Sequence, residues 1–346
     1  MEIPESFQNE QELDEFMSTP YPETVEMMKW LNGDVMILGA GGKMGHSLAA
    51  TLVRAGREAG VERESVEVDL FDDARVEEKI HNMGVKTIAC DLLSPSEVND
   101  LPKIKNIFFM VGRKFGETGS EYLTWIINVV LPGFVGRSLR DLRVVAFSTG
   151  CVYSLTSPES GGSKETDPPR PIGEYANTCL GRERVFEHYS RKNDNKVLLF
   201  RLNYSVDLRY GVLVDIAHQV FNEKPVDLKV GSINCIWQGD AVNRAILSLE
   251  KVEKPPSILN VTGKEILSVR EIAEKFGEIF GKKVQFTGED SGKAYLSDAS
   301  KSIELFGEPK IGPDKMITWV ADWMHRGGSL LGKPTHFQVT DGQFLD

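Results

Sequence analysis

Short apolar runs alternate with longer amphipathic stretches from Asp34 to about residue 202. The apolar runs, such as residues 144–147, have no polar side, as is expected of strands that helices cover on both faces. This alternation predicts repeated strand–helix–strand units, and hence an α/β fold with a Rossmann-type doubly wound parallel sheet. Strands are expected at residues 35–38, 66–70, 87–90, 106–110, 144–147 and 197–202, and helices at 44–58, 76–83, 122–139 and 175–191.

The pattern changes after Asn203, where the apolar runs become shorter and turns more frequent. This change indicates a smaller C-terminal α/β substrate lobe. Because no low-complexity linker separates the parts, we expect the two lobes to share one continuous core. The expected division is a helical lead-in at 1–33, a dinucleotide-binding domain at 34–202 to which 232–262 returns, and a substrate lobe at 203–231 and 263–326. A tail at 327–346 follows, which is either disordered or folded back on the cleft or on a partner subunit.

Composition and charge narrow the classes of partner. The chain has 346 residues, of which 41% are hydrophobic, so it is long and apolar enough for a globular protein with a real core. Its 40 basic and 51 acidic residues give a net charge of -11, which repels phosphate backbones and anionic lipids. Neither nucleic acid nor a membrane is therefore expected as a partner. The most apolar stretch, near residues 125–135, is broken by Pro132 and is too short to span a bilayer.

The N-terminus and the cysteines favour a cytoplasmic protein without a metal. The acidic first residues lack the cationic start and apolar core of a secretory signal. The four cysteines are widely spaced, and the six histidines show no metal-ligand spacing. We therefore expect a cytoplasmic location and no metal site.

Four glycines, at 39, 41, 42 and 45, follow the first predicted strand and lead into the first helix of the predicted sheet. A glycine at 39 permits a tight turn, one at 41 or 42 lets backbone N–H groups approach a pyrophosphate, and one at 45 lets the helix pack close to the strand. The helix N-terminus adds a partial positive charge. The segment therefore predicts a dinucleotide-binding turn rather than an empty one, and Lys43 within it is either a phosphate contact or a solvated charge.

Acidic residues stand at the ends of the next two predicted strands. Asp69, with Asp72 as its competitor, lies near the end of the second strand, where a carboxylate binds the adenosine ribose hydroxyls and discourages a 2′-phosphate. This favours NAD over NADP, although surface solvation explains either aspartate as well. Asp91 follows the third strand, and its carboxylate either reaches the adenine amino group or caps the next turn.

Several segments carry the motifs of a known family. The glycine spacing of residues 39–45 is similar to its nucleotide loop, and the pair Asp91-Leu92 to its adenine-site pair. Residues 147–153 resemble its SSxxVYG motif. On these motifs the chain resembles the NAD-dependent epimerase/dehydratase family, within the extended short-chain dehydrogenase/reductase superfamily, over about residues 34–325. Further matches are residues 201–205, similar to the RPxNxYG segment, and 259–263 and 298–301, similar to C-terminal landmarks of the family.

The resemblance implies an NAD-dependent oxidoreductase or epimerase that transfers hydride at a carbinol carbon of a sugar, sugar acid or nucleotide sugar. It also implies a homodimer formed through the helices at 122–139 and 175–191, the first of which has an apolar face around Trp125. The implied cofactor contacts are Gly39, Gly41, Gly42, Lys43, Met44, Gly45, Asp69, Asp91, Leu92, Val111, Gly112, Tyr175, Leu202 and Asn203. The implied substrate contacts, whose rings and donors suit a hydroxylated ligand, are Arg113, Thr149, Asn203, Tyr204, Arg209, Trp237 and Gln238, with Tyr210 nearby.

The family's chemistry uses a hydroxyl residue, a tyrosine and a lysine in a YxxxK unit, and one of these differs here. The match places the hydroxyl at Thr149, with Ser148 beside it, and the tyrosine at Tyr175. The lysine position is Cys179. A free tyrosine has a pKa of ~10, and an ammonium one helical turn away favours its phenolate, which a neutral thiol does not do.

Three interpretations of this replacement stay open. In the first, Arg113 or Lys114, after the fourth predicted strand, supplies the missing positive charge. In the second, the Cys179 thiol itself takes part in the chemistry, which requires an environment that favours the thiolate. In the third, the site is inactive and the protein is an NAD(P)-binding sensor or scaffold.

Overall fold

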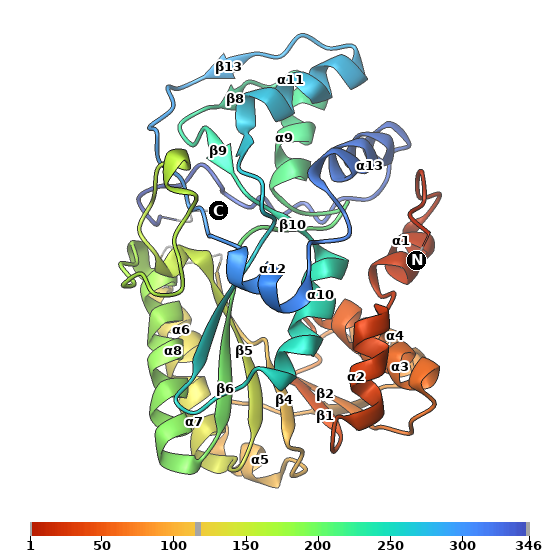
Figure 1. The fold of residues 1–346 in the computed structure, drawn as a ribbon, viewed down its shortest axis with the longest axis vertical. Helices are drawn as coiled ribbons and strands as arrows, with labels where there is room; N and C mark the ends of the chain where they lie inside the picture. The colour runs from red at the N-terminus through yellow and green to blue at the C-terminus, as the bar shows by residue number, and fades with distance from the viewer. Residues whose placement is uncertain (1, 115–118, 344–346) are drawn as a thin grey trace.

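The computed structural model, which describes residues 2–114 and 119–343, contains a seven-stranded sheet, drawn in the lower part of Figure 1. Its strands are β1 Val35–Leu38, β2 Ser65–Asp69, β3 Lys86–Ala89, β4 Asn106–Phe109, β5 Arg143–Thr149, β6 Lys196–Leu202 and β11 Ser257–Val261. The strand order is β11-β6-β5-β4-β1-β2-β3, and every neighbouring pair runs parallel. This confirms the predicted doubly wound, Rossmann-type α/β fold.

Helices cover both faces of the sheet, which explains why its central strands are largely apolar and buried. All four residues of β1 and of β4 are buried. The strand order reverses between these two strands, and ligands of such sheets bind at the carboxyl ends of the strands at this point. One face is covered by α2 (Pro22–Trp30), α3 (Gly45–Ala59), α4 (Ala74–Asn82) and α10 (Gln238–Leu247), and the other by α5 (Pro95–Asp100), α7 (Leu131–Ser138) and α8 (Gly173–Asn193) (Figure 1).

The helix predicted at 122–139 is interrupted. It consists of α6 (Glu121–Trp125), a π-helical turn at Ile126–Val130, and α7. Pro132 explains the interruption, because it has no N–H to donate to a carbonyl of the preceding turn, and a wider turn accommodates it.

The smaller lobe is built around one apolar cluster, which also takes up Leu13 and Met17 from the N-terminal segment. Its helices are α9 (Val212–Phe221), α11 (Val269–Phe280) and α13 (Pro313–His325), with α1 (Glu10–Met17) beside them and α12 (Ser300–Phe306) near the sheet (Figure 1). Its short strand pairs are β7 (Ser205–Val206) with β10 (Ile236–Trp237), β8 (Val226–Asp227) with β13 (Phe286–Thr287), and β9 (Ser232–Ile233) with β12 (Leu267–Ser268). Single 3₁₀ turns lie at Gly150–Val152, Pro158–Ser160 and Ser248–Glu250.

The described ranges contain neither a candidate membrane span nor a candidate metal cluster. Within residues 2–114 and 119–343, no helix combines the length and the apolar character that a membrane span needs. The same ranges contain no group of three or more His, Cys, Asp or Glu side chains that suits a metal ion.

Candidate active site

The turn between β1 and α3 admits only glycine at two positions. Gly39 has a φ of +85°, and a Cβ atom there would lie 2.6 Å from the backbone nitrogen of Val111. A Cβ atom on Gly45 would lie 2.0 Å from the carbonyl oxygen of Ala40. No side chain caps α3 at Met44, so the N–H groups of its first turn can bind an anionic group.

Asp69, the last residue of β2, is fixed against this turn. Its Oδ2 accepts a hydrogen bond from the Gly41 N–H at 2.8 Å, and its Oδ1 accepts one from the Leu70 N–H at 2.7 Å. A Cβ atom on Gly41 would lie 3.0 Å from the Asp69 carboxylate, so glycine at this position also permits the close contact. Asp69 is therefore held at the edge of the glycine turn, where an acid that binds ribose hydroxyls is needed.

A cavity of about 440 Å³ opens beside the glycine turn. Its volume lies within the range of ligand pockets in proteins. Asp91 lines the cavity, and its carboxylate also accepts a hydrogen bond from the Leu93 N–H at 2.8 Å, so the structure is compatible with both roles considered for it. The predicted cofactor residues that line this cavity are Gly39, Gly41, Gly42, Asp69, Asp91, Leu92, Val111 and Gly112, together with the competing Asp72.

A second, inner cavity of about 180 Å³ lies at the carboxyl ends of β5 and β6. It is lined by Thr149, the last residue of β5, and by Tyr175, in the first turn of α8. The two hydroxyl residues that the resemblance assigns to catalysis therefore face one space. The other predicted residues that line it are Lys43, Met44, Lys114, Ser148, Leu202, Asn203 and Tyr204.

The Tyr175 side chain packs against Cys179, one helical turn further along α8. Burial raises the pKa of Tyr175 well above its usual value, and the neighbouring Cys179 and Cys151 raise it further, while Arg182 opposes this. Burial also raises the pKa of Cys179 to about 11. At neutral pH Tyr175 is therefore a phenol and Cys179 a thiol, so the Tyr175 hydroxyl can donate a proton.

Of the two cations proposed to replace the family's lysine, Lys114 is the one beside the tyrosine. Its ammonium lies 5.7 Å from the centroid of the Tyr175 ring. The Arg113 guanidinium instead donates a hydrogen bond to the Ser120 hydroxyl at 2.8 Å, and Arg113 does not line the inner cavity. Its backbone N–H donates to Asn128 at 2.9 Å, which fixes the loop after β4.

Lys43 enters the inner cavity from the glycine turn. Its ammonium lies 3.5 Å from the centroid of the Tyr210 ring. Burial lowers the pKa of Lys43 to about 7, and the nearby charge of Lys114 adds to this. Of the two alternatives left open by the sequence, the position of the ammonium against an aromatic ring in the cleft disfavours a solvated charge, and the phosphate contact stays a prediction.

Replacing Lys43 by methionine is expected to stabilise the ligand-free protein, and more so at pH 6 than at pH 9. In the unfolded chain lysine keeps its proton up to about its ordinary pKa of 10.5, whereas in the folded protein Lys43 loses its proton above a pH of about 7. Between these values the unfolded state binds more protons, so folding becomes more favourable as pH rises, and the full penalty of the buried charge applies below pH 7. We expect a gain of at least ~1 kcal/mol at pH 6 in urea unfolding. Equal gains at both pH values would contradict burial of this charge.

Behind the inner cavity lies a buried ion pair that was not predicted. Glu183 on α8 accepts two hydrogen bonds from Arg201 on β6, at 2.6 and 2.9 Å, and both side chains are almost fully buried. Ser148 donates its hydroxyl to Glu183 at 2.6 Å, so this hydroxyl belongs to the network. The Thr149 hydroxyl oxygen accepts a hydrogen bond from the Cys151 N–H at 3.1 Å, which leaves its proton for another acceptor. A charged residue inside an apolar strand, as Arg201 is, was the available signal.

The prediction that Trp237 and Gln238 face the substrate is wrong. Trp237 is 1% exposed, and its ring centroid lies 5.3 Å from that of Trp319 in the core of the smaller lobe. Gln238 is fully buried and donates its amide N–H to the Ser47 hydroxyl at 3.0 Å. The reason is that β10 runs directly into α10, so that the Trp237 ring packs into the core of the smaller lobe while Gln238 reaches Ser47 on α3.

An outer cavity of about 770 Å³ adjoins the inner one and shares Lys43 and Lys114 with it. Arg209 lines the outer cavity, and its guanidinium is ion-paired with Asp207 at 2.9 Å and with Asp14 at 2.7 Å. The positive charge of Arg209 is therefore largely neutralised by the protein itself.

The chain beyond α13 returns to the cleft between the two lobes (Figure 1). Thr335 donates its N–H and its hydroxyl to the Asp215 carboxylate on α9, at 2.7 and 2.5 Å, and its carbonyl accepts a hydrogen bond from Lys114 at 3.1 Å. The backbone of Gly342 packs against Gly173, just before Tyr175. As far as residue 343, the tail therefore folds back on the cleft and forms one wall of the inner cavity.

Sequence reasoning missed two of these cleft residues. Asp215 is an acid on an otherwise apolar stretch of α9, and a buried acid needs a partner, so a signal was present. Thr335 carried no such signal, because its contacts arise only from the path of the tail.

Comparisons with known proteins place these features in context. The model of the family described as "NAD dependent epimerase/dehydratase family" matches residues 35–205. No curated protein sequence matches the chain. Among solved structures, UDP-glucuronic acid 4-epimerase from Bacillus cereus, in complex with UDP-glucuronic acid and NAD, is 17% identical with a TM-score of 0.70, and the match covers 85% of this chain and 99% of that one. UDP-glucose 4-epimerase from Thermus thermophilus, in complex with NAD, is 20% identical with a TM-score of 0.67, over 86% of this chain and 100% of that one.

Proposed function

The chain belongs to the NAD-dependent epimerase/dehydratase family, and from that premise we propose that it is an NAD-dependent oxidoreductase or epimerase acting on a carbohydrate derivative. One observation carries the proposal: Thr149 and Tyr175 line one cavity close to the glycine turn. Lys43 and Met44 of the turn also line this inner cavity, so a ligand bound at the turn can extend towards the two hydroxyls. This arrangement suits a cofactor bound along the strand ends with its reactive part near Tyr175.

The residues of the glycine turn fit NAD. The backbone of residues 42–44 and the N-terminus of α3 would bind the pyrophosphate, and Asp69, which accepts the Gly41 N–H, would bind the adenosine ribose. The cavity wall formed by Asp91 and Leu92 suits the adenine ring. When bound, NAD accepts and returns hydride, while the side chains of the protein orient the substrate and move its proton.

Replacing Asp69 by serine is expected to weaken NAD binding by ~10-fold and to reduce the discrimination against NADP. The carboxylate accepts hydrogen bonds from ribose hydroxyls in this role and repels a 2′-phosphate. Calorimetric titration with both nucleotides measures the change. Asp72→Ser is the matched control, since Asp72 lines the same cavity, and an equal effect there would transfer the role to Asp72.

Tyr175 is the proposed proton-transfer group, and Thr149 the group that orients the substrate oxygen. Since burial keeps Tyr175 protonated at neutral pH, its phenol can donate a proton to a carbonyl oxygen directly. In the oxidative direction the phenol must first ionise, and the charge of Lys114 beside its ring favours this. The buried Cys179 thiol, with its raised pKa, is poorly suited to act as a thiolate.

A panel of sugars, sugar acids and nucleotide sugars tests the proposal. The purified protein is incubated with NAD and each compound, and net oxidation is detected as NADH absorbance. Epimerisation or dehydration returns the hydride within one turnover, so products are also separated by chromatography. Turnover of one class of compound is the expected result.

A second candidate function, an NAD-binding sensor, is favoured by one observation. Where the family has a lysine, Tyr175 packs against Cys179, a neutral thiol whose pKa burial raises. Tight binding of NAD without turnover of any compound in the panel would favour the sensor over the enzyme.

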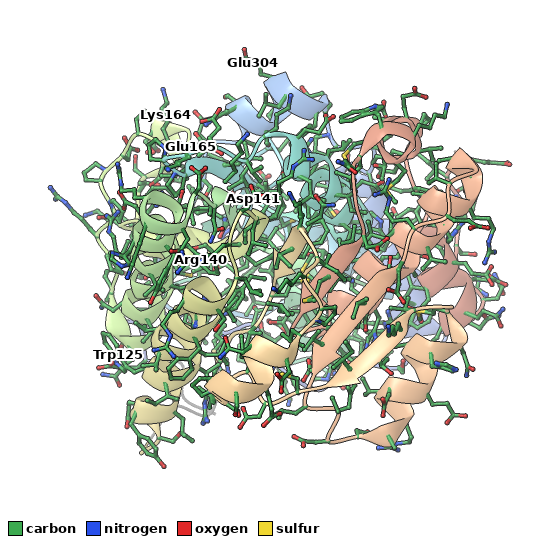
Figure 2. The ribbon with its side chains drawn as sticks, turned by 90° about the horizontal axis from the view of Figure 1, so that it is seen from below. Trp125, Arg140, Asp141, Lys164, Glu165 and Glu304 are labelled. Atoms are coloured by element: carbon green, nitrogen blue, oxygen red, sulfur yellow. The ribbon has the colours of Figure 1, made fainter. Side chains whose placement is uncertain are left out.

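An exposed apolar surface supports a proposed homodimer through α6, the π-helical turn and α8. On it, Trp125 is 42% exposed and Ile126 is 37% exposed, and Figure 2 shows Trp125 at the helical edge of the molecule. Replacing both by glutamate is expected to shift the protein from dimer to monomer in size-exclusion chromatography with light scattering. Ile279→Glu, at a 45% exposed position on α11, is the control that should leave the mass unchanged. A monomeric wild-type protein would contradict the proposal.

A further inference from the structure

Two lysines from different loops line the inner cavity. Lys43 comes from the glycine turn and Lys114 from the loop after β4. Their ammonium groups lie against two aromatic rings of the same cavity, 3.5 Å from the Tyr210 centroid and 5.7 Å from the Tyr175 centroid. Like charges that share a space of about 180 Å³ repel one another, so the cavity favours a negatively charged occupant.

The protein's own acids do not supply a counter-ion to Lys43. In the described part of the chain, no carboxylate forms an ion pair with it. The two acids whose charge acts on Lys43 are engaged elsewhere: Asp207 is ion-paired with Arg209 at 2.9 Å, and Asp215 accepts the two hydrogen bonds from the tail. A ligand anion is therefore the missing partner of this ammonium.

We propose that the inner cavity binds the carboxylate of a sugar acid between Lys43 and Lys114, so that the substrate is a uronic or aldonic acid derivative rather than a neutral sugar. This inference deepens the proposed function and rests on it. It assigns the two lysines to substrate specificity, with Tyr210 as the ring against which one of them is held.

The Thr335 carbonyl marks a place where a substrate oxygen can bind. It accepts a hydrogen bond from Lys114 at 3.1 Å within the wall of the inner cavity. A carboxylate oxygen accepts an ammonium N–H more strongly than a neutral carbonyl does. A sugar acid can therefore compete with the tail for Lys114, whereas the hydroxyl of a neutral sugar has no such advantage.

The sizes of the two cavities fit a substrate that has a small carboxylate group and a larger remaining part. The inner cavity holds a carboxylate close to the hydroxyls of Thr149 and Tyr175, which places the neighbouring carbinol near both. The outer cavity, of about 770 Å³, continues from the two lysines and can accept the rest of a sugar or nucleotide sugar. Pyrophosphate binding, by contrast, uses the backbone of the glycine turn.

Calorimetry on the NAD-loaded protein tests the inference with two matched pairs, D-glucuronate with D-glucose and UDP-glucuronic acid with UDP-glucose. The acidic member is expected to bind at least ~10-fold more tightly in one pair or both, as charge-assisted hydrogen bonds require. Lys43→Met and Lys114→Met should each remove the preference. Lys43→Arg should keep it, and Lys333→Met, which removes an exposed charge from the outer cavity only, should keep it as well. Melting curves verify that each variant is folded.

Equal affinities within both pairs, or no binding of either acid, would overturn the inference. A wild-type protein that fails to bind NAD in the first titration would remove the proposed function instead, so the two failures are distinguishable. Loss of NAD affinity in Lys43→Met with the preference for acids intact would assign Lys43 to the pyrophosphate, and would also overturn its role here. A preference for acids that survives Lys114→Met would likewise overturn the role of Lys114 in binding the carboxylate.

Discussion

Tyr175→Phe is expected to lower kcat by about 10²- to 10⁴-fold, the range that loss of a general acid or base produces. The substitution removes the hydroxyl that faces the inner cavity with Thr149 but keeps the ring, which packs on Cys151, Ala176 and Tyr295. NAD affinity should fall by less than about tenfold, because at most one hydrogen bond to the cofactor is lost. Steady-state kinetics with the substrate found in the panel, together with NAD titration, separate the two effects.

The control for this variant is Tyr122→Phe, at a tyrosine that is 65% exposed on α6. It should change neither kcat nor NAD affinity. If Tyr175→Phe also left kcat unchanged, the proton-transfer role would be lost and the sensor function would gain support.

The pH dependence of the same reaction follows from the raised pKa of Tyr175. Oxidation needs the phenolate, so its rate is expected to rise with pH throughout the neutral and mildly alkaline range. Reduction needs the phenol and should be independent of pH there. Cys179→Lys, which restores the family's unit, should shift the oxidation profile to lower pH, because the new ammonium stabilises the phenolate. A flat oxidation profile in the wild type would show that another group controls the step.

Gly45→Ala is expected to abolish measurable NAD binding and to lower the free energy of unfolding by more than ~2 kcal/mol. The added Cβ atom would lie 2.0 Å from the carbonyl oxygen of Ala40, a backbone atom that cannot move without distorting the turn. The first turn of α3 would then be displaced from its place beside the glycine turn, and with it the N–H groups proposed to bind the pyrophosphate. Urea unfolding and calorimetry with NAD measure the two effects.

Gly133→Ala is the matched control. Gly133 also lies in a helix, α7, but no atom lies within 4 Å of a Cβ added there. Alanine has the better helix propensity, so stability should stay unchanged or rise by up to ~1 kcal/mol. Normal NAD binding by a folded Gly45→Ala protein would contradict the proposed role of the turn.

The sheet could be predicted from sequence because its strands are buried on both faces. The strand expected at residues 35–38 has those bounds, and the one expected at 197–202 begins only one residue earlier. β11 was not predicted as a strand, since it lies at the edge of the sheet and two of its five residues are only partly buried. The π-helical turn before Pro132 was missed because the apolar pattern continues through it.

The parts of the site that follow from the order of residues along the chain could also be predicted. The glycine turn follows a strand directly, and Thr149 and Tyr175 occupy motif positions at a strand end and a helix start. The direction of the Lys43 side chain could not, because it depends on the Tyr210 ring from the other lobe. An aromatic ring such as that of Trp237 is typical of a sugar contact, and only the packing of the smaller lobe shows that this ring is buried in the core.

The central claim, that the glycine turn binds NAD, is tested most directly by calorimetric titration of the ligand-free protein with NAD and NADP. The account predicts one site per chain, tighter binding of NAD than of NADP, and loss of the NAD signal in Gly45→Ala but not in Gly133→Ala. Absence of heat with either nucleotide, at several temperatures and with a protein that is folded, would contradict it.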